Sequence, residues 1–198
     1  GGSYLQTGRN GQTNAVTAES IGALTLDTGA NIITLTQATT AGATTRLTAS
    51  SLIRNNNATA FVRGSNELGT QTALTGGATF LAITASPTAD LIGGSGTYDS
   101  GAAKDIKIVP YFVGDSGASG STLPTFLGYD AGNNSFRTLK SAEYLTSFGS
   151  ATATSNIRLS GTGTAVGITA GTYNSMILNE ATATGTVTYT LDLSLIHI

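Results

Sequence analysis

Five carboxylates gather in the middle of the chain, where acid–base chemistry on glycans is the reaction they could support. They are Asp99, Asp105, Asp115, Asp130 and Glu143. Cleavage of a glycosidic bond needs two carboxyl groups that converge on that bond, one as acid and one as base or nucleophile. The five show no paired spacing along one strand, so we expect solvated loop carboxylates. Lyase chemistry would add cations, and the nearby ones are Lys104, Lys107, Arg137 and Lys140.

The segment GDSGAS, residues 114–119, resembles the nucleophile loop of trypsin-like proteases. Ala118 and Ser119 stand where Gly-Pro follows in those enzymes. A serine nucleophile also needs a neighbouring base, usually histidine, to accept its proton. The single histidine is His197. We therefore expect a Gly-Ser turn here and predict no catalytic residues and no enzyme activity.

Two further segments approach metal-binding patterns without completing them. LIGGSGTYDSG, residues 91–101, is close to a calcium-binding nonapeptide, but Tyr98 occupies the aspartate position and Asp99 follows one residue late. YDAGNNS, residues 129–135, lacks the ligand spacing of an EF-hand and reads as a turn with left-handed Gly and Asn. Cysteine is absent, which excludes thiolate ligands. The sequence predicts no metal and no cofactor.

Charge is scarce along the whole chain. Charged residues make up 10% of the 198, and the formal net charge is -2. The nine basic residues are scattered, so no electrostatic footprint for nucleic acid is present. No apolar run reaches the length of a membrane-spanning helix, so we expect a chain that does not itself span a membrane.

Short strands punctuated by Gly, Asn and Asp must position these side chains. IGALTLDTGANIITLT, residues 21–36, alternates Leu or Ile with Thr in each half, which is the period of a strand. Similar patterns predict strands at 23–26, 32–36, 45–48, 51–54, 59–63, 79–83, 106–109, 157–159, 164–168, 176–178 and 186–191. A turn or two of helix fits only residues 139–148. Pro110 is expected at the start or edge of a strand, because it cannot donate to a ladder.

Threonine-rich, charge-poor strands suit stacked coils. Equivalent side chains of successive coils lie about 4.8 Å apart, and like charges in such columns repel. Threonine fits the pleat, and its hydroxyl can bond the threonine above. Residues 17–26 and 169–178 match in spacing, and residues 48–55 echo them more weakly. We therefore predict an all-β fold of the β-solenoid type with about 20–25 residues per coil; a β-sandwich is the alternative.

The predicted organisation has five parts. A partial leading coil or linker covers 1–16, coils cover 17–89, a loop-rich excursion with a short helix covers 90–150, and coils resume over 151–192. Residues 193–198, LSLIHI, resemble a translated sequencing adapter and are predicted to be non-native. The excursion is expected to hold its own small apolar cluster of Tyr111, Phe112, Phe126, Tyr129, Phe136 and Tyr144.

The chain resembles the autotransporter-associated β-strand repeat proteins, large surface proteins of passenger type. The resemblance rests on ESIGALTLDTGANIITLT, on RLTASSLIRNNNATAFVRG, and on IKIVPYFVGDSGASGS with FLGYDAGNNSFRTLKSAEYLTSF and GTYNSMILN. It covers nearly everything from Thr17 to Asp192. It implies a right-handed parallel β-helix, export, and a location at the cell surface, attached to the outer membrane in the full-length protein. It implies no catalytic residues.

These observations predict a structural stalk that supports adhesion or surface display. Host or neighbouring-cell surfaces and extracellular matrix are the expected partners, and exposed coil ends are expected to make the chain self-associate. The alternative is a polysaccharide-active β-helix enzyme, a lyase or glycosidase, that uses carboxylates of the excursion.

Overall fold

The computed structural model describes residues 1–9, 13–38, 42–65, 67–69, 77–95, 103–116, 123–160, 166–167, 171–179 and 189–190. Asp99, most of the glycine-rich pattern at 91–101, the second half of GDSGAS and the segment 193–198 with His197 lie outside these residues. The chain forms two compact units, one of residues 1–91 with 108–139 and one of residues 92–107 with 140–198. The predicted excursion, 90–150, is thus shared between the two units.

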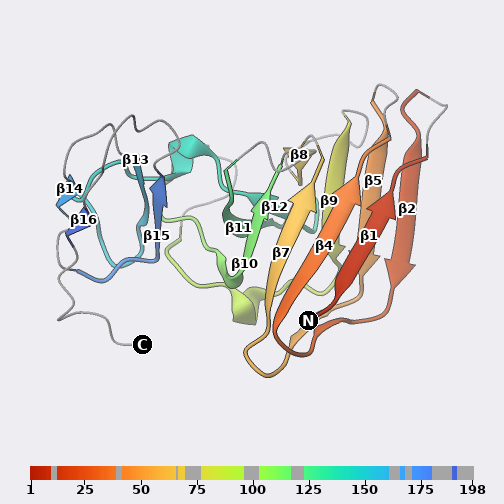
Figure 1. Cartoon of the computed structure of the whole chain (residues 1–198), viewed down its shortest axis with the longest axis horizontal. Helices are drawn as coiled ribbons and strands as arrows, with labels where there is room; N and C mark the ends of the chain where they lie inside the picture. The colour runs from red at the N-terminus through yellow and green to blue at the C-terminus, as the bar shows by residue number, and fades with distance from the viewer. Residues whose placement is uncertain are drawn as a thin grey trace. The chain divides into compact units, whose positions relative to one another are not determined.

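The first unit is built on one ten-stranded sheet, as Figure 1 shows. The strand order is β1-β4-β7-β10-β11-β12-β9-β5-β2, and β8 pairs with β9. The bounds are β1 Ser3–Thr7, β2 Val16–Ile21, β4 Ala30–Thr36, β5 Thr44–Ala49, β7 Thr59–Gly64, β8 Glu67–Leu68, β9 Ala78–Ile83, β10 Val109–Asp115, β11 Thr125–Asp130 and β12 Ser135–Thr138. Two short strands, β3 (Leu24–Leu26) and β6 (Leu52–Arg54), form a separate pair, and η1 is a 3₁₀ turn at Thr88–Asp90.

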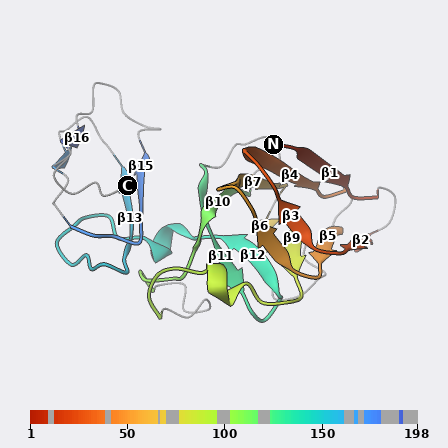
Figure 2. The ribbon, with the colours of Figure 1, turned by 90° about the horizontal axis from the view of Figure 1, so that it is seen from below.

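Most ladders of this unit are parallel, and four of them, β1–β4, β2–β5, β3–β6 and β4–β7, have a nearly constant sequence offset. Val16 pairs with Thr44 and Leu24 with Leu52, so these two ladders share one offset. Ser3 pairs with Ile32 and Ala30 with Thr59, and their common offset is longer by a single residue. Seen from below in Figure 2, β1, β4 and β7 lie in one layer and β2, β5 and β9 in another. These offsets are longer than the roughly 20–25 residues that the sequence predicted for each repeat.

Alternation along the strands places the core between these layers. Ile33 and Leu35 of β4 are buried, and so are Leu47 and Ala49 of β5. The columns predicted for threonine exist, since Thr17, Thr45 and Thr79 lie in register on β2, β5 and β9. Their hydroxyls act differently from the prediction: those of Thr45 and Thr79 donate to the Thr36 and Glu67 carbonyls, each over 3.0 Å. These buried hydroxyls thus supply hydrogen-bond donors to backbone carbonyl groups where the chain turns between strands.

The chain leaves each short strand through residues with left-handed backbone, as the sequence predicted for Gly and Asn. Gly29 has φ 63°, and at the equivalent corner Asn56 and Asn57 have φ 46° and 55°. Asparagine also joins successive levels, because the Asn56 amide donates to the Asp27 carbonyl over 3.2 Å. These side chains supply hydrogen bonds where the ladder is interrupted.

A hairpin closes one end of the sheet and makes it mixed rather than wholly parallel. β11 pairs antiparallel with β10, β12 pairs antiparallel with β11, and β12 pairs antiparallel with β9. The hairpin therefore connects the two parallel layers. Pro110 is the second residue of β10, at an irregularity between Val109 and Val113, and pairing with β7 begins at Phe112. This position agrees with the restriction expected for a proline.

Most of the aromatic residues predicted to form a separate cluster belong to the main core or pack against it, which corrects that prediction; Phe126 is not among them. Phe112 and Phe136 are fully buried in the same cluster as Leu35, Leu47 and Ile83. The Phe136 ring meets those of Phe112 and Tyr129 edge-on at centroid distances of 5.0 and 5.6 Å. Tyr144 lies in the second unit.

The second unit contains two pairs of parallel strands. β13 (Asn156–Ser160) pairs with β15 (Ser175–Asn179), and β14 (Val166–Gly167) pairs with β16 (Tyr189–Thr190). Leu159 lies opposite Leu178 and Val166 lies opposite Tyr189, so both sequence offsets are shorter than those of the β2–β5 and β4–β7 ladders. The predicted helix at 139–148 is one 3₁₀ turn, η3, at Ser141–Glu143.

Buried amides hold the second unit together. The Asn156 side chain donates to the Ile106 carbonyl over 2.9 Å and accepts from Asn174 over 2.8 Å and from Ser175 over 2.7 Å. Polar side chains can occupy this buried position in place of apolar ones because they are hydrogen-bonded to one another. Within the residues described here, no helix has the length and apolar character needed to cross a membrane.

Candidate functional site

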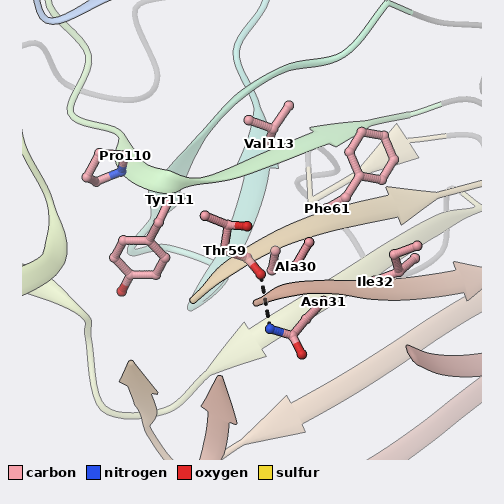
Figure 3. Close-up of a pocket in the computed structure, with 9 residues that line it drawn as sticks. Ala30, Asn31, Ile32, Thr59, Phe61, Pro110, Tyr111 and Val113 are labelled. Atoms are coloured by element: carbon pink, nitrogen blue, oxygen red, sulfur yellow. Dashed lines mark hydrogen bonds between the residues drawn. The ribbon is translucent and has the colours of Figure 1, made fainter. Parts of the chain in front are cut away.

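A groove of about 430 Å³ opens on the outer face of three neighbouring parallel strands of the first unit, β4, β7 and β10 (Figure 3). Its size falls within the range typical of small-molecule sites. Ile32, Phe61 and Val113 form a row at one end of the lining, because they are in register across the three strands. The complete lining is Ala30, Asn31, Ile32, Thr59, Ala60, Phe61, Pro110, Tyr111 and Val113.

The groove exists because the ladder between β7 and β10 starts late. Pro110 lacks an N–H, the β10–β11 ladder is irregular between Val109 and Val113, and the ladder between β10 and β7 begins only at Phe112. Opposite them, Ala30 and Thr59 pair with each other and carry small side chains. A hollow remains between small residues on one side and an aromatic ring on the other, as Figure 3 shows.

Tyr111 is the most perturbed side chain of the groove. Burial and the nearby negative charge of Asp90 raise the pKa of its phenol well above the ordinary value, and Arg54 partly opposes this rise. The Arg54 guanidinium lies 4.3 Å from the centre of the Tyr111 ring. Tyr111 is therefore a neutral phenol near neutral pH, and its buried hydroxyl oxygen has no hydrogen-bond partner among the described residues.

A second guanidinium, that of Arg63, lies beside Phe61 in the row formed by Ile32, Phe61 and Val113. Arg63 lies 5.2 Å from the centre of the Phe61 ring and 3.4 Å from the buried carboxylate of Asp115. Arg63 and Asp115 are in register on β7 and β10. The pair neutralises both charges beside the groove, because a buried carboxylate needs a partner.

The polar groups of the lining are the Asn31 amide and the hydroxyls of Thr59 and Tyr111. The Asn31 amide is engaged, since it donates to the Thr59 carbonyl over 3.1 Å while its oxygen accepts from the Gly2 amide over 2.9 Å. The remaining lining is aliphatic, aromatic or hydroxyl. Such a surface suits a neutral ring or alkyl group rather than a charged ligand.

Two of the predicted carboxylates lie in the first unit, at opposite ends of β11. Gly114 is in register with Thr125, the first residue of β11, so Asp115 lies beside that end, whereas Asp130 is the last residue of the strand. Five strand steps separate the ends by about 17 Å. Carboxyl pairs of glycosidases are about 5–9.5 Å apart. The structure does not bring Asp115 and Asp130 together.

Asp130 instead organises the predicted turn. Its carboxylate accepts from the Gly132 amide over 2.8 Å and from the Asn133 side chain over 2.6 Å. Asn134 has φ 49°, as predicted, whereas Gly132 is not among the residues with positive φ. The carboxylate shapes the link between β11 and β12.

The other predicted charges serve local structure. In the second unit, Asp105 accepts from the Ser95 amide over 3.2 Å, buried Glu143 accepts from the Lys140 amide over 2.7 Å, and Lys104 donates to the Ala142 carbonyl. In the first unit, buried Arg137 donates to the Thr138 carbonyl over 2.8 Å. Lys107 is exposed. Among the residues that the structure describes, no three His, Cys, Asp or Glu side chains could share a metal ion.

No family model matches the chain, and no curated protein or solved structure is significantly similar to it. A proposal about function therefore depends on the sheet and the groove alone.

Sequence reasoning missed the groove residues, although two signals point to them. Ile32 and Ile33 are adjacent, and strict alternation would leave only one of them in the core; Ile32 is 47% exposed. Pro110 precedes two aromatic residues in a strand, which indicates an irregular ladder beside large rings. Outward apolar residues on a charge-poor sheet are the more informative of the two.

Proposed function

We propose that this chain is a structural segment of an exported cell-surface protein, a right-handed parallel β-helix that acts as a stalk. The proposed relatives are the autotransporter-associated β-strand repeat proteins, and the proposed task is support of adhesion or surface display. The observation that carries the proposal is the repeated parallel pairing of β2, β3 and β4 with β5, β6 and β7 at a nearly constant sequence offset.

The pairing supports a stalk because it repeats without using charge. Inward columns such as Ile33 with Val62, and Leu47 with Leu81, are aliphatic. Stacked neutral columns extend along an axis without like-charge repulsion, and each coil contacts only its neighbours. Coils of this kind gain length in proportion to residues and keep outward positions free for contact with partners.

Force spectroscopy tests the architecture. The chain is held at both ends and pulled, and we expect the first unit to release one coil per step, or about 10 nm of extended chain. Steps of unrelated length would contradict stacked coils of equal size. The hairpin end gives an internal reference, since β11 and β12 extend by a different length.

Surface display tests the function. The chain is fused between an outer-membrane anchor and an epitope on a bacterial surface, and binding to host cells and matrix is measured against an anchor-only control. We expect saturable binding that Asp115→Asn and Asp130→Asn do not abolish. Turnover of a glycan panel that those substitutions remove would instead favour the polysaccharide-active alternative. Binding no greater than that of the anchor alone would overturn the adhesive role.

A further inference from the structure

Two segments of the chain have the Asn-X-Ser/Thr pattern that asparagine glycosyltransferases recognise, with X other than proline. One is Asn57-Ala58-Thr59 and the other is Asn133-Asn134-Ser135. Both begin in a turn and end at the first residue of a strand, since Thr59 begins β7 and Ser135 begins β12. Their pattern and position are thus alike, and they differ in how far the fold leaves their side chains accessible.

The asparagine of the first segment lies at the tip of an exposed turn. Asn56 and Asn57 both have positive φ, and the Ala58 amide closes the turn by donating to the Asn55 carbonyl over 2.9 Å. Asn55 and Asn56 donate their side-chain amides to Asp27. Asn57 is exposed, and its side-chain amide has no hydrogen-bond partner among the described residues. Of the three asparagines, Asn57 is therefore the one whose amide nitrogen can react without breaking a bond of the fold.

The hydroxyl two residues after Asn57 is accessible as well. Thr59 is exposed, and within the described part of the chain its Oγ1 atom forms no hydrogen bond. The backbone of Thr59 is fixed, because its amide donates to the Gly29 carbonyl over 3.0 Å and its carbonyl accepts from Asn31 over 3.1 Å. A threonine hydroxyl can donate one hydrogen bond and accept others. An enzyme that recognises this hydroxyl can bind it while the strand stays paired.

Both side chains of the second segment are engaged in the fold. The Asn133 amide donates to the Asp130 carboxylate over 2.6 Å. Ser135 is fully buried, and its hydroxyl donates to the Leu81 carbonyl over 3.1 Å. Recognition of this segment would break both bonds and leave the Leu81 carbonyl without this donor in the interior, which is costly. The second segment is therefore inaccessible while the first unit is folded.

We propose that Asn57 is an acceptor site for an N-linked sugar in the folded chain, and that Asn133 is not. The co-reactant is a nucleotide-activated hexose, and a glycosyltransferase supplies the base. The Asn57 Nδ2 atom forms a bond to the anomeric carbon as the bond from that carbon to the diphosphate oxygen breaks. The nucleoside diphosphate leaves with the electron pair, and Nδ2 loses one proton to the base. The inference goes beyond the proposed stalk function, and its test does not depend on that function.

Transfer of glucose from UDP-glucose by a soluble asparagine glucosyltransferase tests the site, and peptide mass spectrometry locates the product. The purified folded chain is compared with two synthetic peptides that cover residues 53–63 and 129–138. Both peptides contain the pattern without the fold, so we expect both to accept glucose. In the folded chain we expect glucose at Asn57 and none at Asn133.

Three variants separate recognition of the pattern from exposure alone, with circular dichroism to confirm that each one folds. Asn57→Gln removes the acceptor and Thr59→Val removes the hydroxyl with little change of shape, so each should abolish transfer. Asn55→Gln is the matched control, because Asn55 is exposed in the same turn but has no hydroxyl two residues after it; it should leave transfer unchanged. No transfer to Asn57 in the folded chain, equal transfer to Asn57 and Asn133, or transfer that persists in Thr59→Val would each overturn the proposal.

Discussion

The parallel ladders and the hairpin end of the first unit bury their cores by different means. The ladders stack medium and small aliphatic residues, such as Ile33 on Val62, at a nearly constant offset. The hairpin end holds large rings, Phe112 and Phe136, and fully buried Arg137. The difference shows what a chain must change where the parallel pairing ends: large side chains fill the volume of the core, and polar side chains form hydrogen bonds with the irregular backbone.

The largest expected effect tests whether the hairpin is part of the core. Phe136→Ala removes a fully buried ring with two edge-on neighbours and should lower the free energy of unfolding by about 3–5 kcal/mol. Chemical denaturation measures the loss. The control is Phe126→Ala in the same hairpin, where the ring is only partly buried and the loss should be clearly smaller. If Phe136→Ala and Phe126→Ala lowered the free energy of unfolding equally, burial of Phe136 in the main core would not explain its effect.

A smaller effect tests the parallel ladders. Thr45→Val keeps the shape of a fully buried residue but removes the hydroxyl that donates to the Thr36 carbonyl, and should cost about 1–2 kcal/mol in unfolding free energy. Thr34→Val on β4, at a partly exposed outward position, is the matched control and should change little. If both variants were equally stable, the threonine column would matter for its shape and not for its hydrogen bond.

The smallest effect concerns Tyr4 of β1, whose hydroxyl donates to Glu19 of β2. Burial and Glu19 raise the pKa of Tyr4 to about 12, above the value of 10.0 in an unfolded chain. The unfolded chain therefore releases this proton first, and stability falls as pH rises between about 10 and 12. Tyr129 and Tyr111 have raised pKa values too, so Tyr4→Phe should reduce the slope without abolishing it. Denaturation at a series of alkaline pH values measures the slope, and an unchanged slope would contradict the role of Tyr4.

Local pattern was sufficient to predict most strands. Residues 32–36, 45–48 and 59–63 were predicted as strands, and β4, β5 and β7 contain them. The period of two and the positions of Gly and Asn determine these elements locally. The repeated Thr-Ala pairs make Thr17 and Thr48 look equivalent, whereas the ladder pairs Ser20 with Thr48. The register of each strand is decided by which of its apolar residues fill the core, and that depends on all the paired strands at once.

The hairpin and the groove could not be predicted in this way. Nothing local in TFLGYD or SFRT distinguishes an antiparallel partner from a parallel one. The direction follows from the short turn at Asp130–Asn134, which allows only an antiparallel return. The groove depends on a missing stretch of ladder beside Pro110, and residues 59, 61 and 111 meet there only after three strands have aligned.

The asparagine residues at the corner after β6 are sites where slow hydrolysis of a side-chain amide would alter the structure. Asn55 and Asn56 both donate to Asp27, one to its carboxylate and one to its carbonyl. Asparagine is among the thermolabile residues, and hydrolysis converts its side-chain amide into a carboxylate. At either position this would replace a hydrogen-bond donor by an acceptor and add a negative charge beside that of Asp27. Ageing of the molecule would therefore begin where the chain bends and leave the aliphatic columns for last.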